Sequence, residues 1–302
     1  MKEKHVQSNA FLEGPILPPL VRFALPLILS LLLQGLYGAV DLAVVGRFAS
    51  TASTAAVAVG SQMMMTITAV VTGLTMGVTV LVGKAIGANT PQQASRVVAA
   101  QIRLFLVVTV VLTAAIWLLA PVSMGWMHVP ADAVDETLSY LRICGSGMVF
   151  VAAYNGISGI FRGLGNSRIP LLFVFLACCI NVVLDLVLVA GLQMGAAGAA
   201  VATVVAQAGS VAFSLVYLRR HPLPFGLYRE DFRCPGVQKQ ILSVGAPIAL
   251  QDTLVNTSFL IITSIVNRLG LVEAAGIGIT EKLFVFLSMV PMAFMSALST
   301  FV

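Results

Sequence analysis

Long apolar runs separated by short polar segments dominate the chain. Runs of about twenty or more apolar residues are long enough to cross a bilayer as a helix. They occupy eight ranges: 17–46, 53–82, 95–120, 137–161, 169–190, 196–218, 239–267 and 275–302. Glycine, asparagine and proline gather between them, as at Gly87 and Asn89. The pattern predicts an all-α polytopic membrane protein with about eight transmembrane helices.

The composition supports this fold class. The 302 residues are 59% hydrophobic and only 10% charged, whereas a soluble domain has about 25% charged residues. The 26 glycines suit helices that associate by close packing in lipid. The four cysteines show no spacing typical of a metal site, so we expect packing thiols.

The basic residues predict the orientation. If the N-terminus is cytoplasmic, 13 of the 17 lysines and arginines fall on the cytoplasmic side and only Arg47 and Arg268 fall outside. The net charge of +5 therefore reflects topology and not a nucleic-acid partner. We expect a multi-pass protein of the bacterial cytoplasmic (inner) membrane, in contact with the lipid bilayer.

An internal repeat divides the chain. Residues 23–48 resemble residues 244–269, with Pro26 aligned on Pro247, and a charged connector lies between the two copies. The expected domains are an N-terminal six-helix lobe (1–218), a cytoplasmic linker (219–238) and the first two helices of a second, repeated lobe (239–302). The last apolar run reaches Val302 without a flanking charge, so we expect a C-terminally truncated two-lobed protein; a natural eight-span protein is the alternative.

Carboxylates inside the apolar runs are the candidate chemistry. Asp41 and Asp185 each lie about two turns from the outer end of their helices, so at 1.5 Å per residue they share a depth. Asn181 lies one turn from Asp185, and Thr203 is expected at a similar level on the sixth helix. Two carboxylates close together in lipid favour a bound proton or sodium ion. Asp41, Asn181, Asp185 and Thr203 are therefore the candidate cation site; helix-tying hydrogen-bond acceptors are the alternative.

Other polar and flexible side chains are candidates for substrate contacts or movement. Gln34 and Tyr37 share a helical stripe with Asp41, and Tyr140 and Gln207 are expected at the same depth. Met63 and Met64 offer either an adaptable surface for substrates or ordinary packing. Pro26 and Pro247 are candidate hinges or static kinks. No nucleophile–base arrangement or metal motif is present, so we expect no catalytic residues, no enzyme activity and no cofactor beyond the coupling cation.

Three sequence segments carry a resemblance to a known family. The first helix, with Pro26, Gln34, "LYGAVD" ending at Asp41 and "VGR" at 45–47, resembles that of multidrug and toxic compound extrusion (MATE) transporters. "LVGKAIGAN" (81–89) is similar to the family's loop after helix two, and "GISGIFRGLGNSRIP" (156–170) to its signature between helices four and five.

The resemblance implies a secondary antiporter of two six-helix lobes that exports small organic, often cationic, compounds in exchange for protons or sodium, monomeric when full length. In the branch that resembles the DNA-damage-inducible F type, it implies a cation site at Asp41, Asn181, Asp185 and Thr203. Other branches place a glutamate on helix seven where Val255 stands here, with Asp252 one turn earlier. A flippase for lipid-linked saccharides and a non-transporting membrane fragment are the rival functions.

Overall fold

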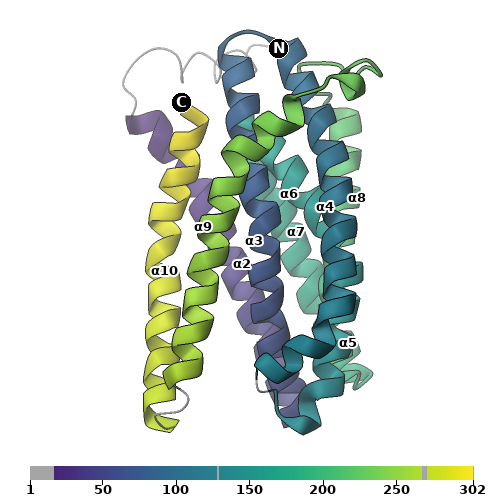
Figure 1. The fold of residues 1–302 in the computed structure, drawn as a ribbon, viewed down its shortest axis with the longest axis vertical. Coiled ribbons are helices and arrows are strands. Elements are labelled where there is room, and N and C mark those ends of the chain that lie inside the picture. The colour runs from purple at the N-terminus through teal and green to yellow at the C-terminus, as the bar shows by residue number, and fades with distance from the viewer. Residues whose placement is uncertain (1–16, 128, 267–270, 302) are drawn as a thin grey trace.

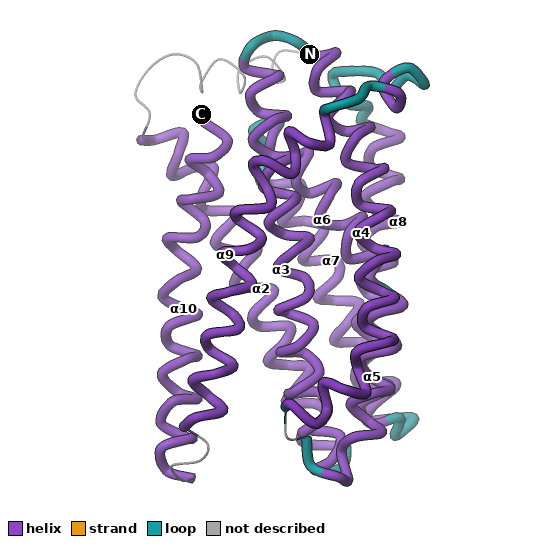
Figure 2. Tube along the Cα trace, viewed as in Figure 1, coloured by secondary structure: helices purple, strands orange, loops and turns teal. Residues whose placement is uncertain are grey.

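The computed structural model describes residues 17–127, 129–266 and 271–301, and the helices of this part are joined by short loops (Figures 1 and 2). The predicted N-terminal tail through residue 16, Arg268 and Val302 lie outside the described residues. The α-helices are α2 (Leu17–Phe48), α3 (Thr51–Gly87), α4 (Pro91–Trp126), α5 (Val134–Ser146), α6 (Met148–Gly163), α7 (Arg168–Asp185), α8 (Gly195–Arg220), α9 (Val237–Val266) and α10 (Leu271–Phe301).

The predicted membrane architecture is confirmed. Within the described residues, five helical segments are long and apolar enough to span a bilayer, and a bent pair of helices makes a sixth. The helices α9 and α10 fill the seventh and eighth predicted ranges with 30 and 31 residues. Their lengths follow from the bilayer, because about twenty residues at 1.5 Å each cross its apolar core.

The fourth predicted span is two helices and not one. The helices α5 and α6 meet at Gly147 with a bend of 47°. Gly147 packs so closely against α8 that an added Cβ would lie 2.5 Å from the Val204 side chain. The bend between α5 and α6 thus falls where Gly147 lets the chain approach α8 closely. Hydropathy does not report such a contact.

The fifth span also departs from a regular α-helix. The α-helix α7 ends at Asp185, and a six-residue π-helix, η2 (Leu186–Gly191), continues the span. Short π-helical turns occur frequently at functional sites, because they shift side chains out of the regular helical register. Here the shift begins immediately after a buried carboxylate.

Successive spans run in alternating directions, with the bent pair α5 and α6 counted as one span, and this gives the bundle two distinct ends. We call the end that carries the connector 221–236 the linker side; the loops 49–50 and 192–194 lie at the opposite side (Figure 1). The predicted orientation would place the linker side in the cytoplasm.

On the linker side, α9 packs against α3 through glycine. An added Cβ at Gly245 would lie 2.8 Å from the Leu74 Cα and 3.0 Å from the Gly73 carbonyl oxygen. At Gly77 it would lie 2.7 Å from the Ile241 carbonyl oxygen. Small residues let helix backbones approach closely in lipid, where dispersion contacts hold helices together.

The helix α10 packs against α2 on the same side. The buried side chains Leu20, Phe23, Ala24 and Leu27 of α2 form one cluster with Ala293 and Ala297 of α10. Toward the opposite side, α9 diverges from α3 (Figure 1). Large apolar side chains of that half of the α9–α10 pair are exposed, among them Leu254, Ile261, Phe286 and Leu287.

The connector is fastened to the start of α4 by a buried carboxylate. The Ser95 hydroxyl donates to Asp231 Oδ2 at 2.5 Å, and the Tyr228 N–H donates to the same oxygen at 3.0 Å. Arg96 Nε lies 3.9 Å from Asp231 Oδ1. These hydrogen bonds, chiefly that of Ser95, and the nearby Arg96 charge hold the pKa of Asp231 below its usual range. The connector therefore leads into α9 from a fixed point.

Replacing Gly245 by alanine should destabilise the protein, because the added methyl group meets backbone that cannot move alone. Overpacking of this kind lowers the free energy of unfolding by about 1–3 kcal/mol. Gly38→Ala is the matched control, since an added Cβ there meets nothing within 4 Å. Thermal unfolding in detergent should show a lower Tm for Gly245→Ala and an unchanged or higher Tm for Gly38→Ala. Equal Tm values would contradict the proposed role of the α3–α9 contact.

The Asp231 interaction should make stability depend on pH. Because the folded-state pKa is lowered, its stabilisation is complete above about pH 5 and is lost as the pH falls through the ordinary value of about 3.9 and below. Thermal unfolding should show a smaller loss of Tm between about pH 5 and pH 3 for Asp231→Asn than for wild type. Glu230→Gln, at an exposed neighbour, is the control and should follow wild type. An unchanged pH profile in Asp231→Asn would refute the interaction.

Candidate functional site

The helix α2 turns Asp41 into the bundle. Asp41 is 4% exposed and lies on the same buried face as Val44 and Val45, whereas Leu36 on the outer face is 57% exposed. A carboxylate at this depth in a membrane protein is rare unless it faces the protein interior or a polar path. Asp41 lies seven residues before the end of α2, in the half of this helix that is farther from the linker side.

The helix α7 brings a second carboxylate and an amide to the interior. Asn181 and Asp185 lie one turn apart and have no exposed surface. Asp185 is the last residue of α7, so the π-helix η2 begins directly after it. Contacts of α2 with both α7 and η2 bring this end of the span toward Asp41.

The third wall comes from α8, whose interior face consists of small residues. Ala196, Ala199, Ala200, Ala202 and Ala206 are buried, which allows α8 to lie close to α5 and α7. Thr203 and Gln207 lie one turn apart on this helix and are partly buried.

The two carboxyl groups interact directly across the α2–α7 boundary. Asp41 and Asp185 are electrostatic neighbours, and the Tyr37 hydroxyl lies beside Thr203 and close to both acids. Tyr140 and Cys144, one turn apart on α5, also border Asp41. The structure thus brings Asp41, Asn181, Asp185, Thr203, Tyr37 and Tyr140 together. Cys144 was missed, although its spacing from Tyr140 would have signalled it.

Several oxygen atoms of this cluster are buried and unsatisfied. Within the described part of the chain, no hydrogen-bond partner meets the buried side-chain oxygens of four residues: Asp41 Oδ1, Asn181 Oδ1, both Asp185 oxygens and Gln207 Oε1. Buried polar atoms of this kind are rare because each costs free energy unless it is paired. Oxygen ligands of carboxylate, amide and hydroxyl type suit a hard cation, and a shared carboxylate pair also suits a proton.

The remaining predicted residues lie elsewhere. Met64 is in the hydrophobic core of the bundle with Met63 packed beside it, which fits the packing alternative of the sequence analysis. Pro26 and Pro247 lie inside the helices α2 and α9. Gln34 is exposed toward a cavity between the α9–α10 pair and the bundle.

That cavity has a volume of about 150 Å³ and includes residues that the sequence did not single out. Helices α2, α3, α6, α7, α9 and α10 form its walls. Its polar lining includes Arg162 and Ser158 of α6, Asp252 of α9 and Ser296 of α10. Arg162 stands within the segment 156–170, which the sequence analysis noted only for its resemblance to a family signature.

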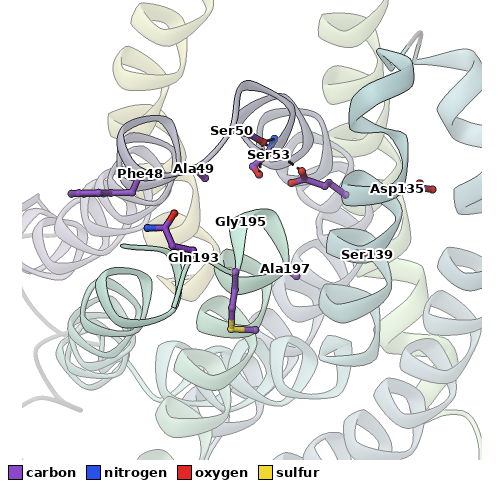
Figure 3. Close-up of a pocket in the computed structure, with 11 residues that line it drawn as sticks. Phe48, Ala49, Ser50, Ser53, Asp135, Ser139, Gln193, Gly195 and Ala197 are labelled. Atoms are coloured by element: carbon purple, nitrogen blue, oxygen red, sulfur yellow. Dashed lines mark hydrogen bonds between the residues drawn. The ribbon is translucent and has the colours of Figure 1, made fainter. Parts of the chain in front are cut away.

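A larger hollow of about 440 Å³ opens at the opposite side (Figure 3). Ser50, Ser53 and Gln193 line it with the first turn of α5, where Asp135 and Glu136 lie. The Ser50 hydroxyl donates to Glu136 Oε1 at 3.5 Å. Tyr140 lies one turn further along α5 than Glu136, so this hollow is located beyond the carboxylate cluster, toward the opposite side.

Comparison with known proteins identifies a family profile and several similar proteins. The MatE family profile matches residues 26–187. A probable multidrug resistance protein of Bacillus subtilis, YpnP, is 27% identical over 291 residues, which cover 95% of this chain and 64% of that protein. DNA damage-inducible protein F of Escherichia coli is 28% identical over 252 residues, or 82% of this chain and 54% of that protein.

The solved structures agree on the fold. A multidrug resistance MATE family transporter in an outward-facing conformation superposes with a TM-score of 0.87 at 24% identity, over 100% of this chain and 66% of that one. The chain spans about 64% of the first curated relative's length. The profile match extends from Pro26 through Asp41 to Asp185, more than half of the chain, and therefore the chain belongs to the MatE family.

Proposed function

We propose that the protein is a secondary active multidrug efflux antiporter, which exchanges small organic, often cationic, compounds for protons or sodium by alternating access. The observation that carries the proposal is the cluster of buried, unpaired oxygens around Asp41 and Asp185. Two acids that face each other away from water are stable only with a positive charge between them. That charge is the coupling ion, and no other cofactor and no enzymatic step is needed.

The coupling ion is held by Asp41, Asn181, Asp185 and Thr203. A proton would bridge the two carboxyl groups, and a sodium ion would use the amide and hydroxyl oxygens as well. Binding shifts the equilibrium between two conformations only if the ion prefers one of them. The arrangement of α2 supports such a preference, because its one end carries Asp41 and its other end packs on α10.

The contacts between the α9–α10 pair and the bundle support an outward-open state. They gather on the linker side, which the charge distribution predicts to be cytoplasmic. Pro26 lies in α2 between Asp41 and the cytoplasmic end, where a residue without an N–H weakens the helix. We propose Pro26 as the hinge about which α2 changes when the ion binds, with Pro247 at the matching position of α9.

Substrate passes between the α9–α10 pair and the bundle, which we take as parts of two lobes (1–218 and 239–302) joined by the linker 219–238. Gln34 and Met76 line the cavity there, and Met292 and Met295 add flexible apolar surface from α10. Tyr37, Tyr140 and Gln207 lie at the ion site. The protein resides in the bacterial cytoplasmic membrane with a cytoplasmic N-terminus and acts as a monomer when full length.

Two rival functions are distinguishable. A flippase for lipid-linked saccharides needs a basic cavity, yet Arg162 is the one basic side chain among the described lining residues. A non-transporting membrane fragment predicts no dependence on a cation gradient at all.

Asp41→Asn should abolish gradient-driven export without unfolding the protein, because the amide is isosteric but cannot share a cation with Asp185. The measurement is dye efflux from proteoliposomes that contain the 302-residue chain, with an imposed proton or sodium gradient. Asp132→Asn, an exposed carboxylate near the opposite side, is the matched control and should export like wild type. Export by Asp41→Asn at the wild-type rate would exclude the proposed mechanism. Absence of gradient-driven export in the wild-type chain would favour the fragment.

A further inference from the structure

The cavity between the α9–α10 pair and the bundle is lined by an arginine that forms no ion pair within the described residues. Arg162 lies in its wall, and its Nε atom is buried without a hydrogen-bond acceptor among the described residues. Among the described residues an ion pair joins Arg96 to Asp231, and Arg162 forms none. A guanidinium remains protonated in proteins, so it cannot escape burial by losing its charge. An anion at this position would remove a penalty that the protein alone does not compensate.

Two hydroxyl groups that line the cavity are also buried. Ser158 lies one turn before Arg162 on α6 and is 3% exposed, and Ser296 of α10 is 8% exposed. The Ser296 Oγ has no hydrogen-bond partner in the described residues, whereas the Ser158 Oγ lies within hydrogen-bond reach of the Tyr154 hydroxyl, one turn earlier on α6. Buried hydroxyls elsewhere in these helices donate to a carbonyl of the preceding turn, as Ser30 does to Pro26 at 2.8 Å. The Ser296 hydroxyl can therefore donate to a ligand that the guanidinium attracts, and the Ser158 hydroxyl can do the same when it accepts from Tyr154.

The facing wall carries the opposite charge. Asp252 of α9 lines the cavity but does not form an ion pair with Arg162. The cavity thus presents a cation from one side and a carboxylate from the other, with space between them. Its volume of about 150 Å³ is below the usual range of about 300–1,000 Å³ for sites that enclose a drug-sized ligand. It therefore suits the charged head of a ligand whose apolar part remains outside.

We propose that this cavity binds the zwitterionic head group of an amphipathic ligand, with the anionic group on Arg162, Ser158 and Ser296 and the ammonium on Asp252. The inference deepens the proposed transport function and rests on it for its role in the cell. The binding itself does not require transport or the ion at Asp41. The head group could belong to a soluble amphipath or to a zwitterionic lipid.

The test is calorimetric binding to the purified 302-residue chain in detergent with three matched probes. 4-(Aminomethyl)benzoate carries both charges, whereas benzoate and benzylamine each carry one. We expect the zwitterion to bind at least about tenfold more tightly than either single-charge probe, which corresponds to about 1.4 kcal/mol. Arg162→Gln should weaken the binding of benzoate and the zwitterion but leave the binding of benzylamine unchanged. Asp252→Asn should weaken the binding of benzylamine and the zwitterion but leave the binding of benzoate unchanged. Arg168→Gln, an exposed arginine of the same side that does not line the cavity, is the control.

Equal affinity of wild type for the three probes would overturn the proposal, as would equal weakening of all three by both variants. Should Arg162→Gln fail to fold, Arg162→Lys keeps the charge and must keep the order of preference, and Asp252→Asn still tests the other wall. Competition by added phosphatidylethanolamine would assign the site to a lipid head group, and its absence to a soluble ligand. Selective binding without gradient-driven export would contradict the proposed antiport but support the head-group site. Gradient-driven export without selective binding would support the antiport but contradict the head-group site.

Discussion

Two carboxyl groups that face each other inside an apolar bundle are the constraint on which the structure depends. Asp41 and Asp185 come from helices distant in sequence, and three of their four carboxylate oxygens have no hydrogen-bond partner among the described residues. A positive charge must therefore accompany them whenever both are ionised. The alanine face of α8 and the π-helix after Asp185 are the packing features that allow this juxtaposition.

The ion site and the contact between the two helical groups are connected through α2. Its first half packs against α10 on the linker side, and its second half carries Asp41. The glycine-lined contact of α3 with α9 and the fastening of the connector at Asp231 fix the same side. Binding or release of a cation at the carboxylate pair therefore acts on α2, whose linker-side end is held by α10. We infer that α2 moves mainly at its other end, on the opposite side of the bundle.

Much of this arrangement is predictable from sequence because the bilayer imposes it. Helix lengths and the shared depth of Asp41 and Asp185 follow from hydropathy and helical rise. The bend at Gly147 and the π-helix after Asp185 do not, because they depend on how closely neighbouring helices approach. The same holds for the direction of side chains: Met64 packs in the core, whereas Arg162, which the sequence analysis did not single out, lines a cavity.

The most direct test of the shared cation is a double-mutant cycle on cation-dependent stability. The melting temperature of the purified chain is measured in detergent against proton and sodium concentration for wild type, Asp41→Asn, Asp185→Asn and the double variant. A cation at 100 times its Kd would stabilise wild type by about 2.7 kcal/mol. Asp41→Asn and Asp185→Asn should each remove most of this stabilisation, and the double variant should lose no more than either single variant. Cation-dependent stabilisation that persists in the double variant would contradict a shared site.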